Sequence, residues 1–86
     1  MEILYKPTFV RQFENLDPDL QEEVLEKITL FQNKKNHRLL KVHKLKGKLA
    51  GRHSFSVNYK TRIVFSYVNT RVVVFLAIGD HAVYNE

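Results

Sequence analysis

The segment "RIVFSYVNTRVVVFLAIG", residues 62–79, carries the strongest strand pattern in the chain. Its first half alternates apolar and polar side chains, which is typical of a strand with one buried face. Residues 71–79 are apolar at almost every position, as expected of a central strand that is covered on both faces. Asn69-Thr70 is short enough to close a tight hairpin between the two. The segment therefore predicts two antiparallel strands at the middle of a sheet.

A third strand precedes this hairpin. Residues 52–58, "RHSFSVN", alternate in the same way, and the pattern places Ser54 and Ser56 on the solvent-facing side. Residues 58–61 provide a slightly longer hairpin loop to the next strand. Together the three strands form an antiparallel meander.

The N-terminal half predicts helices. Residues 2–5, "EILY", are expected to form a short strand, after which Pro7 fits the first turn of a helix. In "LDPDLQEEVLEKITLFQNKK", Asp17 is a natural N-cap and Pro18 takes the first helical position. Apolar residues recur at helical spacing in both segments, so we expect a helical hairpin.

These elements define the fold class. We predict one α+β domain over residues 1–86, with a short N-terminal strand, a helical hairpin and a three-stranded antiparallel meander whose helices pack on one face. Residues 36–53, between helices and meander, are expected to form a basic loop or short helix tethered by its leucines. With no cysteine, no secretory leader pattern and no long apolar run, the sequence predicts a soluble cytoplasmic protein with no membrane partner.

Charge is distributed unevenly along the chain. Five of the nine acidic residues lie between Asp17 and Glu26, whereas the interval from Lys27 to Gly79 holds twelve basic residues and no acidic one. A one-sided distribution of this kind attracts polyanions. The pattern fits nucleic acid or an acidic protein partner, and it also fits a solvated basic face without a specific partner.

Metal and cofactor chemistry have little support in the sequence. The four histidines, His37, His43, His53 and His81, are dispersed, whereas a metal site needs converging ligands at short spacing. Neither a glycine-rich phosphate loop nor a Gly-x-Ser-x-Gly elbow is present. We therefore expect no metal and no cofactor.

Histidine, arginine, lysine and tyrosine on a basic surface suit the cleavage of RNA by its own 2′-hydroxyl. That reaction needs a base, an acid and fixed cations for the charge that develops on phosphorus. Antiparallel pairing about Asn69-Thr70 places Arg62 near the segment from Ile78 to His81. A lone histidine at the end of a strand is more often an ordinary surface residue, so spacing alone leaves the role of His81 open.

"HKLKGKLAGRHSFSVNYKTRIVF" and "VVVFLAIGDHAVY" together resemble the RelE/ParE superfamily of toxins from toxin–antitoxin systems, over nearly the whole chain. The resemblance is stronger to the RelE/YafQ-like branch, whose members cleave mRNA on the ribosome without metal, than to the ParE-like branch, whose members inhibit DNA gyrase. It implies a cognate antitoxin whose acidic or amphipathic segment covers the basic face, and mRNA on the ribosome as substrate.

The resemblance also implies site residues. His81 matches the position of the general acid, His43 in "HKLKG" matches a catalytic histidine, Arg62 matches the arginine that contacts the scissile phosphate, and Tyr84 matches an aromatic that orients a base. Thr61 stands where an aromatic is common. The expected RNA-binding residues are Lys44, Lys46, Lys48, Arg52 and Lys60. The alternative is a gyrase inhibitor or an inactive toxin-fold protein that binds an antitoxin.

Overall fold

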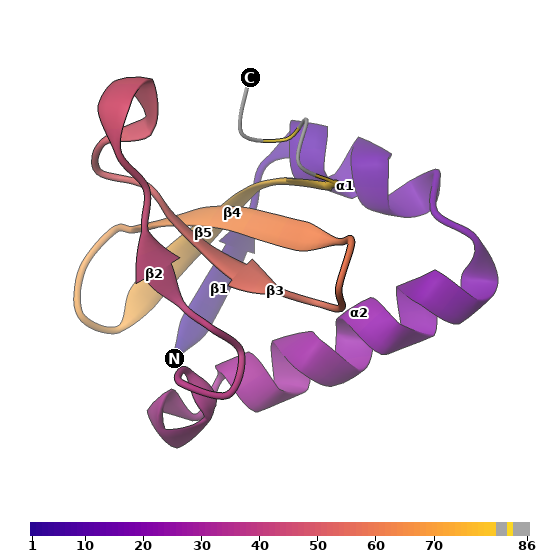
Figure 1. Cartoon of the computed structure of the whole chain (residues 1–86), viewed down its shortest axis with the longest axis horizontal. Coiled ribbons are helices and arrows are strands. Elements are labelled where there is room, and N and C mark those ends of the chain that lie inside the picture. The colour runs from indigo at the N-terminus through magenta and orange to yellow at the C-terminus, as the bar shows by residue number, and fades with distance from the viewer. Residues whose placement is uncertain (81–82, 84–86) are drawn as a thin grey trace.

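A computed structural model of the chain describes residues 1–80 and Val83. Within them, two α-helices and a five-stranded mixed sheet make up the fold (Figure 1). The helices are α1 (Pro7–Glu14) and α2 (Pro18–Phe31), with short 3₁₀ turns η1 (Lys34–Asn36) and η2 (Gly47–Leu49). The strands are β1 (Glu2–Tyr5), β2 (His43–Lys44), β3 (His53–Ser56), β4 (Arg62–Tyr67) and β5 (Val72–Gly79). No helix among the described residues is long and apolar enough to cross a bilayer.

The helical hairpin forms where the sequence predicts it. Pro7 is the first residue of α1, and Pro18 is the first residue of α2. The carboxylate of Asp17 caps α2 by accepting a hydrogen bond from the backbone N–H of Leu20 at 2.9 Å. The side-chain amide of Gln21 donates to the carbonyl of Phe13 at 3.0 Å and so ties the start of α2 to α1.

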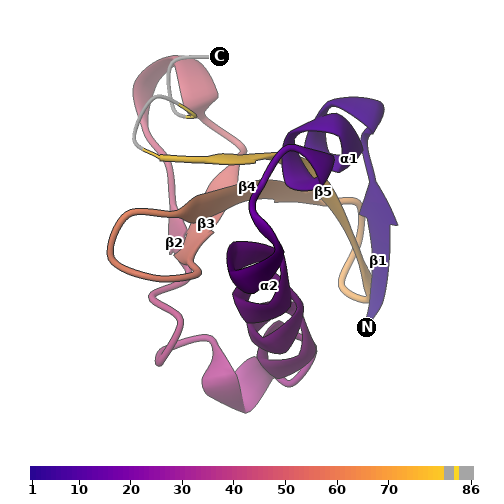
Figure 2. The same cartoon turned by 90° about the vertical axis from the view of Figure 1, so that its right-hand side faces the viewer.

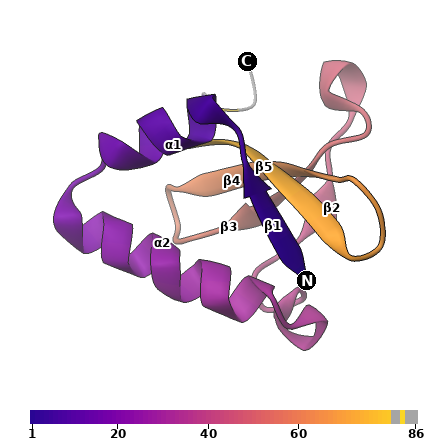
Figure 3. The same cartoon turned by 180° about the vertical axis from the view of Figure 1, so that it is seen from behind.

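The sheet has the strand order β1-β5-β4-β3-β2. β1 pairs with β5 in parallel and lies alongside it in Figure 3, while the other neighbours pair antiparallel. This order confirms the α+β class and the predicted meander. β2 was not predicted, because its two residues pair with β3 inside a segment that the sequence indicated only as a loop.

The connection between β4 and β5 is wider than the predicted two-residue hairpin. β4 ends at Tyr67 and β5 begins at Val72. The side chain of Asn69 accepts hydrogen bonds from the N–H groups of Arg71 and Val72, at 2.8 and 3.0 Å. Asparagine commonly supplies such bonds in turns, and here they replace ladder bonds that a tighter hairpin would make.

A β-bulge interrupts the β4–β5 ladder. Phe65 pairs with Phe75 but Val64 pairs with Ala77, so Leu76 is the extra residue on β5. With the bulge and the wider turn, Arg62 pairs with Gly79, within the segment from Ile78 to His81 that the sequence predicted.

The main core lies between the helices and one face of the sheet. Its centre is Phe31, which is fully buried at the end of α2. The Phe31 ring stacks on Phe55 with centroids 4.6 Å apart and meets Phe65 edge-on at 4.9 Å. The same ring also stacks on His37, again at 4.6 Å. The core cluster comprises Phe9, Val24, Ile28, Phe31, Leu40, Phe55, Val57, Ile63, Phe65, Val73, Phe75 and Ile78.

A second, smaller cluster covers the opposite face of the sheet. Val64, Ala77 and Val83 are buried there, with Leu45 and Leu76 packed against them. The loop that follows β2 rises on the side of the sheet away from α2 (Figures 1 and 2). Ser54 pairs with Val64 and is fully buried, so the prediction that it faces solvent was wrong. The alternation of apolar and polar residues shows that a strand has two faces, but it does not show that a loop covers the polar face.

Candidate functional site

The sheet places Arg62 at an edge where two strands end. Arg62 opens β4 and pairs with Gly79, the last residue of β5. This confirms that the end of β5 lies beside Arg62, as far as Gly79. The predicted acid His81 and the predicted aromatic Tyr84 lie outside the described residues.

The turn between β3 and β4 is braced by the side chain of Asn58. Its Oδ1 accepts hydrogen bonds from the N–H groups of Lys60 and Thr61, both at 2.9 Å. Its Nδ2 donates to Oε1 of Glu23 in α2 at 2.7 Å, which joins the turn to the helix. Thr61, at the position where an aromatic was expected, is buried beneath the turn. The turn is therefore held by its own backbone and by a helix from the other half of the chain.

The same turn holds the guanidinium of Arg62. Nη1 of Arg62 donates to the carbonyl oxygens of Asn58 at 2.5 Å and Thr61 at 3.2 Å. A guanidinium has five N–H donors in a planar fork. The two bonds through Nη1 fix the plane of the group, and the donors on its other nitrogens keep a geometry suited to an anion. Asn58 thus positions Arg62, a role that could not be inferred from the sequence beyond the preference of asparagine for turns.

A shallow depression of about 620 Å³ adjoins Arg62. It is lined by Tyr59, Lys60, Arg62 and Asp80. The depression thus brings Lys60, a predicted phosphate contact, together with Arg62. Asp80 adds one negative charge at the same place, so an anion must approach from the side of the two cations.

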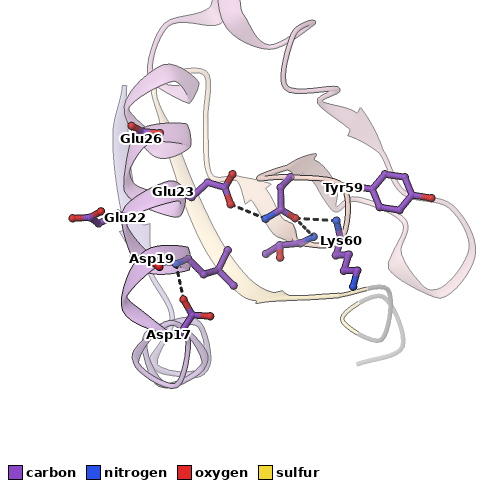
Figure 4. Close-up of a pocket in the computed structure, with 10 residues that line it drawn as sticks. Asp17, Asp19, Glu22, Glu23, Glu26, Tyr59 and Lys60 are labelled. Atoms are coloured by element: carbon purple, nitrogen blue, oxygen red, sulfur yellow. Dashed lines mark hydrogen bonds between the residues drawn. The ribbon is translucent and has the colours of Figure 1, made fainter.

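A larger groove on the other side of the turn is acidic (Figure 4). It has a volume of about 790 Å³ and runs between α2 and residues 58–61. Its acidic residues are Asp17, Asp19, Glu22, Glu23 and Glu26. This concentration of negative charge repels phosphate, so the groove is unsuited to a polyanion.

His43 reaches the same face of the sheet as Arg62, although the two residues do not adjoin. His43 pairs with Ser54, which pairs with Val64, so all three side chains share the face to which Arg62 also belongs. Two strand spacings separate His43 from β4, which is roughly 10 Å. Nδ1 of His43 lies 2.8 Å from the carbonyl oxygen of Lys41. Because a carbonyl only accepts, Nδ1 carries the proton and Nε2 is the basic nitrogen of the neutral ring.

The remaining predicted RNA contacts divide between two faces. Lys46 and Lys48 are exposed on the loop around η2. Arg52 lines a second depression, of about 310 Å³, with Val64 and Val83, next to the position of Arg62 along β4. Lys44 pairs with His53 and so belongs to the opposite, helix-covered face. The structure therefore does not bring Lys44 to Arg62.

His53 is a titratable residue that the sequence did not single out. Its ring stacks on Phe65 at 5.4 Å and meets Tyr67 edge-on at 4.9 Å. Its Nδ1 is buried without a hydrogen-bond partner. Burial, and then the neighbouring charges of Lys44 and His43, lower the pKa of His53 from its usual value near 6.5. His53 therefore favours the neutral form in the folded protein.

This lowered pKa predicts a pH-dependent stability. Below about pH 6.5 the unfolded chain protonates His53 before the folded protein does, so the free energy of unfolding falls as the pH drops towards the folded pKa. Replacing His53 with phenylalanine keeps the stack on Phe65 and removes this titration. Urea unfolding at pH 7.5 and pH 5 should show a smaller loss for His53→Phe than for the wild type. Parallel losses in the two proteins would contradict the assignment.

No group of three or more potential metal ligands converges within residues 1–80 and Val83. No protein-family model and no curated protein match the chain.

Solved structures do match it. A mutant of YafQ from E. coli superposes with a TM-score of 0.76 at 16% identity, covering 99% of this chain and 98% of that one. The chain has the fold of the RelE/ParE toxins. A YoeB/ParE toxin from Agrobacterium tumefaciens gives a TM-score of 0.68 at 18% identity, covering 94% and 99% of the two chains. The toxin–antitoxin complex RelBE2 from Mycobacterium tuberculosis gives 0.72 at 20% identity, with 93% and 96% covered. The match to the YafQ mutant thus extends the RelE/ParE fold over 99% of the chain.

Proposed function

We propose that residues 1–86 are one toxin domain of a toxin–antitoxin system, and that it is a ribosome-dependent endoribonuclease that cleaves mRNA without metal. The observation that carries the proposal is the position of Arg62. A braced turn holds its guanidinium at an open edge of the sheet, beside Lys60 and the end of β5. A fixed cation of this kind stabilises charge on a phosphoryl group, because it needs no reorganisation during the reaction.

The proposed reaction transfers two protons. A base removes the proton of the ribose 2′-hydroxyl, and the oxygen attacks the adjacent phosphorus. The bond from phosphorus to the 5′-oxygen breaks, leaving a 2′,3′-cyclic phosphate, and an acid protonates the departing 5′-oxygen. His43, with Nε2 basic, is the candidate base and His81 the candidate acid. Arg62 stabilises the pentacoordinate phosphorus, and Tyr84 orients a base. In the described arrangement His43 lies too far from Arg62 for one phosphate to contact both side chains. Either the RNA spans this distance or the segment that carries His43 moves towards Arg62.

The proposed partners follow from charge. The exposed Lys46 and Lys48 and the neighbouring Arg52 form a basic surface on the side of the sheet away from α2. An acidic or amphipathic antitoxin segment lying over that surface would neutralise it and block access to Arg62. One structure of the same fold, RelBE2, is a toxin–antitoxin complex, which supports an antitoxin as a partner.

Primer extension on a defined mRNA tests the proposal. The purified protein is incubated with the mRNA, with and without programmed ribosomes, and the new 5′ ends are mapped. We expect cuts only with ribosomes, and none with His81→Ala at equal concentration. An absence of cuts under both conditions, with inhibition of DNA supercoiling by gyrase, would replace the proposal with the gyrase-inhibitor alternative. Cleavage by His81→Ala at the wild-type rate would overturn its role as the acid.

A further inference from the structure

Tyr59 is exposed to an extent that is unusual for a large aromatic. It lies in the turn between β3 and β4, and 90% of its surface is accessible. Aromatic side chains are ordinarily well covered, since they carry a large apolar area. The described residues provide no ring contact for Tyr59, whereas Tyr5 and Tyr67 both pack on phenylalanines. The exposed ring is therefore available to bind a ligand outside the folded chain.

The backbone that carries Tyr59 is braced. Hydrogen bonds from the N–H groups of Lys60 and Thr61 to Asn58 lie on its C-terminal side, and the N–H of Val57 donates to the carbonyl of Thr61 at 2.9 Å. The bond from Asn58 to Glu23 anchors the same turn to α2. A ring on a braced turn loses less conformational freedom when it binds a ligand than a ring on a free loop.

The surroundings of Tyr59 indicate the kind of ligand. The ring lines the depression that also contains Arg62 and Lys60. Figure 4 shows the ring pointing away from α2, and Tyr59 and Lys60 also line the rim of the acidic groove between the turn and that helix. A flat, exposed ring beside two fixed cations matches the combination by which proteins hold single-stranded nucleic acid, with the base stacked and the phosphate paired.

We infer that Tyr59 is a stacking surface for an unpaired nucleobase of the RNA strand whose phosphate lies on Lys60 and Arg62. This inference rests on the proposed RNA substrate and adds a base-binding position to it. Asp80 also lines the depression, and its carboxylate repels phosphate, so the phosphate lies on Lys60 and Arg62 and the base on the ring. Tyr59 and Lys60 also line the acidic groove, whose carboxylates repel phosphate, so the strand continues from Tyr59 towards Arg62.

Binding measurements with three substitutions test the inference. Fluorescence anisotropy with a labelled six-nucleotide single-stranded RNA at 50 mM salt gives the dissociation constant for each variant. Removing a base–aromatic stack weakens binding about tenfold, so we expect that loss for Tyr59→Ala and for Tyr59→Leu, which keeps apolar bulk without a flat ring. Tyr59→Phe keeps the ring and should bind like the wild type.

A duplex of the same sequence is the matched control. All of its bases are stacked, so only phosphate contacts remain, and Tyr59→Ala should bind it as the wild type does. Equal affinities of wild type and Tyr59→Ala for the single strand would overturn the inference, as would an equal loss on the duplex or no wild-type binding to either RNA. Loss of affinity for a protein partner alone would also overturn it and assign the ring to a protein interface.

The two hypotheses fail separately. If the wild type binds single-stranded RNA through Tyr59 but makes no cuts on programmed ribosomes, the proposed nuclease activity is wrong and the stacking position stands. If the wild type cuts and Tyr59→Ala binds and cuts equally well, the stacking position is wrong and the nuclease activity stands.

Discussion

We expect the replacement of Arg62 with alanine to lower the rate of the proposed mRNA cleavage on programmed ribosomes by about 10²–10³-fold, because the transition state loses a preorganised donor. Arg62→Lys restores only part of the rate, since an ammonium keeps the charge without the planar fork that Nη1 anchors to the turn. The measurement is single-turnover cleavage with the protein in excess, which separates the chemical step from product release.

A second arginine gives the matched control. Arg71 is exposed in the turn between β4 and β5, at the far end of the sheet from Arg62. Arg71→Ala removes the same charge and should change the rate by less than about threefold, the loss expected from weaker long-range attraction alone. Equal losses in the two variants would show that net charge, and not the placement of Arg62, drives the reaction.

Asn58 provides an independent test of how Arg62 is positioned. Asn58→Ala removes the acceptor for Lys60 and Thr61 and the donor to Glu23, so the turn loosens while the arginine remains. We expect a lower kcat with a smaller change in KM, because the charge that attracts RNA is unaltered. A purely structural role for Asn58 would lower the melting temperature without changing kcat for the fraction that stays folded.

Replacing Phe31 with alanine lowers the free energy of unfolding by about 3–5 kcal/mol, the usual cost of deleting a buried phenylalanine. Phe31 has no exposed surface, and its ring contacts Phe55 in β3, Phe65 in β4 and Phe75 in β5. A domain of this size is stable by about 5–15 kcal/mol, so the variant retains little stability. Urea unfolding followed by circular dichroism measures the change.

Leu39 is the control for this second prediction. It is 71% exposed, so Leu39→Ala should change the free energy of unfolding by no more than about 0.5 kcal/mol. A loss below about 1 kcal/mol for Phe31→Ala would mean that the stacked rings do not form the centre of the core.

Local signals predicted most of the secondary structure. Asp17 and Pro18 defined the start of α2 because capping depends on neighbouring residues alone. The alternation in β4 and the apolar run in β5 placed the central hairpin, and with it Arg62 beside the end of β5. These features depend on contacts that are close in sequence or repeat regularly.

What the sequence could not predict depends on distant contacts. β2 has only two residues and exists because β3 pairs with it. Ser54 is buried on the face of the sheet where the second apolar cluster packs, and the bulge at Leu76 shifts a register that simple counting treats as regular. The hydrogen bond from Asn58 to Glu23 joins residues 35 positions apart, and no local sequence pattern predicts it.

The parallel pairing of β1 with β5 sets the order in which the protein can be completed during synthesis. Glu2 pairs with Val72, about 70 positions later, whereas the meander of β3, β4 and β5 forms between neighbours in sequence. Contacts over such long separations form late, because closing the intervening loop costs entropy before any contact repays it. A nascent chain therefore keeps its first strand unpaired until β5 has left the ribosome, and the sheet is completed only after residues 72–79 have emerged.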